Sequence, residues 1–210
     1  MSGLLALLDD VAGIAKIAAA SVDDVAGQAV KAGAKAAGAV IDDAAVTPKY
    51  VHGFTAAREL PIVWRIARGS FFNKLVILLP IALLLSAFAP WLITPLLMIG
   101  GAYLCCEGAE KVLHALSHHQ VNEPHLTVTP EGAAGLEETR VKGAIKTDFI
   151  LSAEIMTIAL ATIPTDDTIW QKALILAVVA IGITVAVYGF VALIVKAEDV
   201  GLHLAQHRGP

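Results

Sequence analysis

One carboxylate lies well inside an apolar segment, where its chemistry would be that of an ion or proton carrier. Glu154 is five residues from the start of the apolar segment 149–163. A carboxylate at such a depth in a membrane requires a partner, a water-filled cavity or a proton. Lys146 and Asp148 stand just before the same segment, and we take Glu154, Asp148 and Lys146 as a candidate ion or proton path. A structural alternative stays open, in which Glu154 pairs with a neighbouring cation and Thr147 or Asp148 caps a helix N-terminus.

A second group has the spacing of a metal site on one helix. Glu107, Glu110 and His114 are three and four residues apart and share a helix face, and His118 follows one turn later. Such a face binds a divalent metal when a second helix supplies further ligands. No second helix can be assigned, so a solvated face with a Glu107–Lys111 ion pair is the favoured interpretation. We expect neither enzyme activity nor a cofactor, because no nucleophile elbow, phosphate loop or zinc-hydrolase motif is present.

Cations stand beside aromatic residues in segment 50–74, and further cations, Arg140, Lys142 and Lys146, stand in the approach to segment 149–163. This mixture is typical of the lipid headgroup zone, where cations meet anionic lipid and rings lie at the interface. For segment 50–74 it predicts a helix lying in that zone. Glu138 and Lys142 have the spacing of an i,i+4 ion pair. The candidate lipid-facing residues are Arg58, Trp64, Arg65, Arg68, Lys74, Arg140 and Lys142.

The composition assigns these residues to a membrane protein. Apolar residues make up 57% of the 210 residues and charged residues 16%, whereas soluble domains have about 45–50% and about 25%. The net charge is −4, which disfavours nucleic-acid binding. The expected partners are therefore the lipid bilayer, a small ion or solute, and a second copy of the chain, with no nucleic acid.

Two pairs of apolar segments indicate two helical hairpins. Residues 75–106 carry no charge, and as one helix they would measure about 48 Å, too long for one crossing of about 30 Å. Pro90 and Pro95 divide them into arms of 73–89 and 93–110, each short enough that a re-entrant hairpin stays open. We expect Pro80 to kink the first arm. The second hairpin joins 149–163 to 173–195 through a turn at 164–167.

The fold class that follows is all-α, a polytopic membrane protein with about four transmembrane helices and an amphipathic Ala/Gly-rich N-terminal region. Every Lys and Arg except Lys172 falls on one side of these crossings. This asymmetry predicts that both termini are cytoplasmic. The predicted divisions are the N-terminal region 1–48, the basic and aromatic segment 49–74, the hairpin 75–110, the loop 111–148, the hairpin 149–195 and the tail 196–210.

The N-terminal region contains a short repeat. Residues 9–13 and 23–27 have the same sequence, DDVAG, and the two-heptad offset places both copies on nearly the same helix face. Small residues on the apolar face permit close helix contact. We expect a helical hairpin on the cytoplasmic side, with a gating plug or a membrane-surface anchor as alternatives.

Several stretches resemble a known family. These are the opening MSGLLALLDDVA, residues 49–58 and 65–74, and the run VKGAIKTDFILSAEIM at 141–156. Together they resemble the YedI-like bacterial inner-membrane proteins, over essentially the whole chain. That family has no assigned function, so the resemblance implies a multi-pass inner-membrane location and no mechanism. It also implies members that are longer than the present sequence and have a further Gly-rich membrane region.

Two functions are compatible with these features. The first is an ion- or proton-coupled transporter or channel that uses an intramembrane carboxylate. The second is a structural or interaction protein that oligomerises through the small residues of its N-terminal helices.

Overall fold

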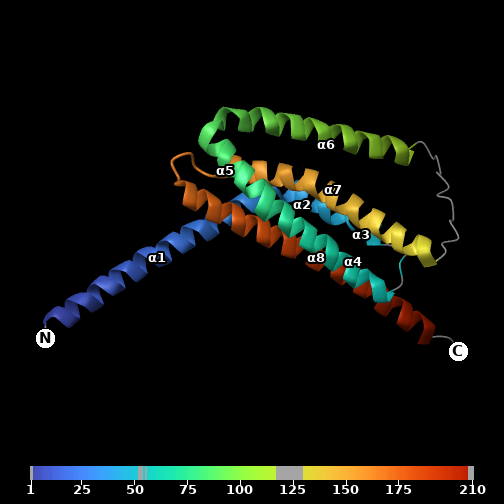
Figure 1. Cartoon of the computed structure of the whole chain (residues 1–210), viewed down its shortest axis with the longest axis horizontal. Coiled ribbons are helices and arrows are strands. Elements are labelled where there is room, and N and C mark those ends of the chain that lie inside the picture. Colours follow the sequence, from blue (N-terminus) through green and yellow to red (C-terminus); the bar gives the residue numbers. More distant parts are fainter. Residues whose placement is uncertain (1, 52–53, 55, 117–129, 208–210) are drawn as a thin grey trace.

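The computed structural model describes residues 2–51, 54, 56–116 and 130–207, and these residues form helices and short connections without any strand. Figure 1 shows an elongated bundle from which one helix projects. The all-α fold class is confirmed over the described part of the chain.

The N-terminal helix α1 (Ser2–Lys35) is continuous and is followed by α2 (Ala37–Val46) and α3 (Pro48–Val51). Its first half projects from the bundle. Burial begins at Val25 and continues at Ala29, Ala32 and Ala36, which follow a three-to-four-residue spacing. Because these side chains are small, α1 and α2 pack closely on α7 and α8. The expected helical hairpin is wrong for this region, since α1 does not fold back on itself.

A single helical run connects the basic segment to the first apolar arm. It consists of α4 (Ala56–Phe72), the π-helix η1 (Asn73–Leu78) and α5 (Leu79–Phe88). The N–H of Leu79 donates to the carbonyl of Lys74, five residues back, and the next residue, Pro80, has no N–H to donate. The basic segment is therefore the beginning of a long helix that continues into the apolar arm, and its position in the headgroup zone stays a prediction.

The first hairpin turns where the prolines predict. Helix α5 ends at Phe88, and a 3₁₀ turn, η2 (Pro90–Leu92), leads into α6 (Ile93–Leu116). Pro95 lies in the first turn of α6, where its missing N–H disrupts no helical hydrogen bond. Helix α6 packs mainly on α7 along one edge of the bundle (Figure 1).

The last two helices are α7 (Pro130–Thr162) and α8 (Ile169–His207). Helix α7 lies between α4, α6 and α8, with α1 to α3 also packed on it. The turn between α7 and α8 is held by Lys172, whose Nζ donates to the carbonyl of Thr165 at 3.0 Å.

Three helical runs of the described chain are long and apolar enough to cross a membrane: Arg58–Phe88, Pro90–Glu110 and Ile169–Ala197. The fourth predicted crossing falls in α7, whose last 18 residues contain Lys146, Asp148 and Glu154. These charges exclude α7 from that group, and the count of four crossings stays a prediction. Figure 1 places the start of α1 and the end of α8 at opposite ends of the long axis, so the arrangement does not bring the two termini together.

Candidate functional site

A buried ion pair joins the first helical run to α7. Lys74 Nζ lies 2.9 Å from Asp148 Oδ1, and the two side chains are 1% and 2% exposed. The same carboxylate oxygen accepts hydrogen bonds from the hydroxyls of Ser70 at 2.9 Å and Tyr188 at 3.1 Å. Lys74 also donates to the Ser70 oxygen. Burying two charges is costly, and these additional hydrogen bonds are what such a pair requires.

Three helices supply this site. Ser70 and Lys74 are four residues apart at the junction of α4 and η1, Asp148 is in the middle of α7, and Tyr188 is in α8. The wide turn of the π-helix buries two consecutive polar residues, Asn73 and Lys74. Asn73 Nδ2 donates to the carbonyl of Ile145 on α7 at 3.3 Å. A π-turn of this kind is frequently found at functional sites.

Helix α2 brings a second carboxylate to the cluster. Asp43 is 2% exposed and interacts electrostatically with both Asp148 and Lys74. Burial, followed by the negative charge of Asp148, raises the pKa of Asp43 to about 7. Asp43 therefore gains or loses a proton near neutral pH.

Three buried oxygens at this site have no hydrogen-bond partner in the described part of the chain. They are Asp43 Oδ2, Asp148 Oδ2 and Ser152 Oγ. Ser152 is fully buried and lies one helical turn from Asp148 on α7. Buried oxygens usually have a hydrogen-bond partner, so these three mark the cluster as a candidate functional site.

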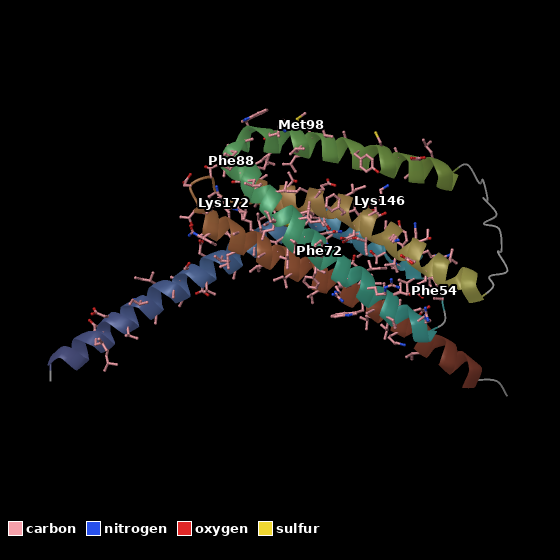
Figure 2. All side chains as sticks on the ribbon, viewed as in Figure 1. Phe54, Phe72, Phe88, Met98, Lys146 and Lys172 are labelled. Atoms are coloured by element: carbon pink, nitrogen blue, oxygen red, sulfur yellow. The ribbon has the colours of Figure 1, made fainter. Side chains whose placement is uncertain are left out.

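The structure separates the residues of the predicted ion path. Asp148 belongs to the buried cluster, whereas Lys146 is exposed on the surface of α7 (Figure 2). Glu154 is half-buried and lines a mainly apolar cavity between α6 and α7, with Gly100 and Tyr103 on the opposite wall. The alternative role of Asp148 as a helix cap is wrong, because α7 begins at Pro130.

The candidate metal residues do not form a described site. Glu110 is exposed on α6, the side chains of Glu107 and His114 lie outside the described residues, and so does His118 altogether. No group of three His, Cys, Asp or Glu side chains is suitably placed for a metal within the part of the chain that is described.

Lys74 is predicted to face lipid, and the structure contradicts this prediction. It is the largest fully buried side chain among the described residues, so its predicted contact with headgroups is wrong. The π-helix turns it inward, where Asp148 compensates its charge. A usable signal was present in the sequence: Lys74 and Asp148 are opposite charges, each next to an apolar segment. Nothing in the sequence distinguished Asp43 from its neighbour Asp42.

Three of the other predicted lipid-facing cations, Arg58, Arg65 and Lys142, have carboxylate partners. Arg58 and Arg65 both bind Glu137, with Arg65 Nη1 2.9 Å from Glu137 Oε1. Hydrogen bonds from Arg58 hold the pKa of Glu137 below its ordinary value. The predicted pair of Lys142 with Glu138 is confirmed at 2.8 Å.

Aromatic residues accompany these cations. Arg140 lies over the ring of Phe54, 5.4 Å from its centre. The side chain of Trp64 is 70% exposed. Both arrangements suit the interfacial role expected of this segment.

Comparison with known proteins yields one match. The family model DUF808, a protein of unknown function, matches residues 2–209. No curated protein and no solved structure matches the chain. The match agrees with the expected uncharacterised family, and the YedI-like name stays a prediction.

Proposed function

This chain belongs to the DUF808 family of proteins of unknown function, and we propose that it carries protons across a membrane, coupled to a small ion or solute, through Asp43 and the Lys74–Asp148 pair. The observation that supports this function is the buried cluster of one cation and two carboxylates, two of whose carboxylate oxygens have no partner in the described part of the chain. Two of the helical runs that supply the cluster, Arg58–Phe88 with Lys74 and Ile169–Ala197 with Tyr188, are apolar enough to span a bilayer.

The charge balance of the cluster makes it sensitive to one proton. When Asp43 is protonated, Lys74 and Asp148 neutralise each other and the cluster carries no net charge. When Asp43 loses its proton, one buried negative charge is uncompensated, which is costly in a low-dielectric interior. The loss of a proton therefore favours either the uptake of another cation or a movement that brings Asp43 into contact with water.

Helix α2 is the element whose position this proton controls. Asp43 reaches the cluster from α2, which packs on α7 and α8. An apolar groove lies between α2 and α8, lined by Ile41, Ala45, Val187 and Phe190 among others. Because the groove between α2 and α8 is lined by small and apolar side chains, a movement of α2 along it would break few polar interactions. Helix α2 is therefore the element that we expect to alternate between two positions.

Proton flux into proteoliposomes tests this function directly. A potassium diffusion potential drives protons inward, and an enclosed pH-sensitive dye reports their arrival. We expect Asp43→Asn to abolish the flux and Asp42→Asn, the matched neighbour, to preserve it. Unchanged flux in Asp43→Asn would contradict the proposal, provided that thermal unfolding shows the variant to be folded.

We infer the bacterial inner membrane as the location. The resemblance to YedI-like proteins and the three apolar helical runs support this inference. Reporter fusions at each terminus test the predicted cytoplasmic position of both ends. A periplasmic signal from the N-terminal fusion would contradict that orientation and agree with the separation of the termini in Figure 1.

A second candidate function is self-association through α1. Large apolar side chains are exposed along its projecting half, namely Leu7, Leu8, Val11, Ile14 and Ile17. A helix with such a surface is expected to bury it against another helix or a bilayer. Light scattering of the detergent-solubilised protein tests this role. Loss of the oligomer after deletion of residues 2–22 is the expected result, and an unaltered oligomer argues against it.

A further inference from the structure

The surface between α4 and α7 contains a groove of about 480 Å³ that is separate from the buried ion pair. Its walls include Arg65, Arg68 and Phe72 from α4, and Lys142 and Ile145 from α7. We propose that this groove binds an anionic phospholipid, with the phosphate at the arginines and an acyl chain along the apolar end. The volume is within the range of small-molecule sites.

Positive charge predominates in the groove. Arg65, Arg68 and Lys142 line it together with one carboxylate, Glu138. Lys142 is paired with Glu138, and Arg65 shares Glu137 with Arg58.

Arg68 supplies the uncompensated charge. Its side chain is exposed and makes no ion pair within the described part of the chain. A guanidinium without a carboxylate presents a fork of donors that matches two phosphate oxygens. Arg68 is therefore the residue that we expect to bind the headgroup.

The groove becomes apolar in the direction of the membrane span. Phe72 follows Arg68 by one helical turn, about 6 Å along the axis, and Ile145 stands opposite on α7. Gly69 lies between Arg68 and Phe72 on α4, and a Cβ atom at this position would lie 2.6 Å from Ile145 Cδ1. The absence of a side chain at Gly69 lets α4 and α7 approach closely at the floor of the groove.

This change from cationic to apolar matches a phospholipid better than a free phosphate ion. A phosphate ion would use only the arginine end, whereas a lipid also covers Phe72 and Ile145. The 70% exposed Trp64 lies one turn before Arg68, on the side where an interfacial aromatic residue is expected beside a headgroup. The side chain of Phe72 is 57% exposed, so lipid would reach it.

Native mass spectrometry of the full chain in detergent tests the site with three probes: phosphatidylglycerol, phosphatidylcholine and inorganic phosphate. We expect phosphatidylglycerol to bind at least tenfold more tightly than phosphatidylcholine, and inorganic phosphate to leave its binding unchanged. Equal binding of the two lipids would overturn the proposal. Displacement of phosphatidylglycerol by inorganic phosphate would overturn the assignment to a lipid.

Two matched variants locate the site. Arg68→Gln should weaken phosphatidylglycerol binding about tenfold, the effect of one lost charge-assisted contact. Lys146→Gln removes an exposed cation of α7 outside the groove and should leave binding unchanged. Equal effects of the two variants would show general attraction between charges and would overturn the proposal. Proton flux is measured on both, so that failure of the lipid site is distinguished from failure of the transport function.

Discussion

The Lys74→Met substitution tests how much the buried ion pair between Lys74 and Asp148 contributes to the stability of the bundle. It leaves the Asp148 carboxylate, 2% exposed, with only the hydroxyls of Ser70 and Tyr188 as donors. Removing one partner of a buried pair costs about 3–5 kcal/mol, because the other charge stays buried and uncompensated. We expect the free energy of unfolding to fall by about that amount.

The opposite substitution, Asp148→Asn, should cost less. Lys74 keeps its bond to Ser70, and Asp43 is close enough to become the new counter-ion. Loss of the negative charge on Asp148 removes one of the causes that raise the pKa of Asp43, so this pKa should fall below about 7. At pH 7.5 we expect Asp148→Asn to lower the free energy of unfolding by an amount close to the lower end of the range given for Lys74→Met. The loss should increase as the pH falls and Asp43 becomes protonated.

The double variant separates the charges from the packing. Lys74→Met combined with Asp148→Asn removes both charges, yet the amide oxygen still accepts from Ser70 and Tyr188. Directly interacting residues show coupling energies of about 0.5–3 kcal/mol. We expect the double variant to cost about 2 kcal/mol less than the sum of the two single variants.

Equilibrium unfolding in mixed detergent micelles, followed by circular dichroism at constant pH, measures all four proteins of this cycle. Single-variant costs that add within about 0.5 kcal/mol would refute the reasoning, because independent sites behave in that way. The result would then show that Lys74 and Asp148 do not interact as a buried ion pair.

Three further predictions concern stability at other positions. The pKa of Asp43 is about 7 in the folded protein, whereas its ordinary value is 3.8. The contribution of its protonation to the free energy of unfolding is therefore greatest below pH 3.8, and it falls by about 4 kcal/mol as the pH rises to 7. Unfolding measured from pH 4 to 8 should show this slope, and Asp43→Asn should flatten it. Gly69→Leu should cost about 1–3 kcal/mol by overpacking against Ile145, whereas Gly182→Leu, with nothing within 4 Å, should cost little. Equal melting temperatures for the two leucine variants would contradict the close approach of α4 and α7. Glu137→Gln should cost about 1 kcal/mol in thermal unfolding, because its two arginine partners are more than half exposed, and a much larger loss would show that this contact is less accessible to solvent than the structure indicates.

Local chemistry determines the features that could be predicted from the sequence. The turn near Pro90 was predictable because two closely spaced prolines interrupt a long uncharged stretch. The Glu138–Lys142 pair was predictable because residues four apart on a helix lie side by side. Both features depend on residues close together in the sequence.

The composition of the buried site depends on contacts between distant segments. Lys74 and Asp148 are 74 residues apart, and their pairing depends on the π-helix and on the face that α7 turns toward α4. The depth of Glu154 in its apolar segment indicated a central position, yet its side chain faces α6. Depth along a helix is readable from sequence, whereas the direction around the helix axis is set by packing partners.

The charges of α7 also have a consequence for how the protein is made. A helix with Lys146, Asp148 and Glu154 in its last 18 residues enters a bilayer poorly by itself, since each such charge costs about 2.5–3.5 kcal/mol at the centre of an inserting segment. During synthesis, Lys74 emerges from the ribosome well before Asp148, and Tyr188 emerges last. If α7 forms the predicted fourth crossing, its insertion becomes favourable only as Asp148 pairs with Lys74 on a helix that is already in place. Until then Asp43, which precedes Lys74 in the chain, is the carboxylate that can compensate this cation.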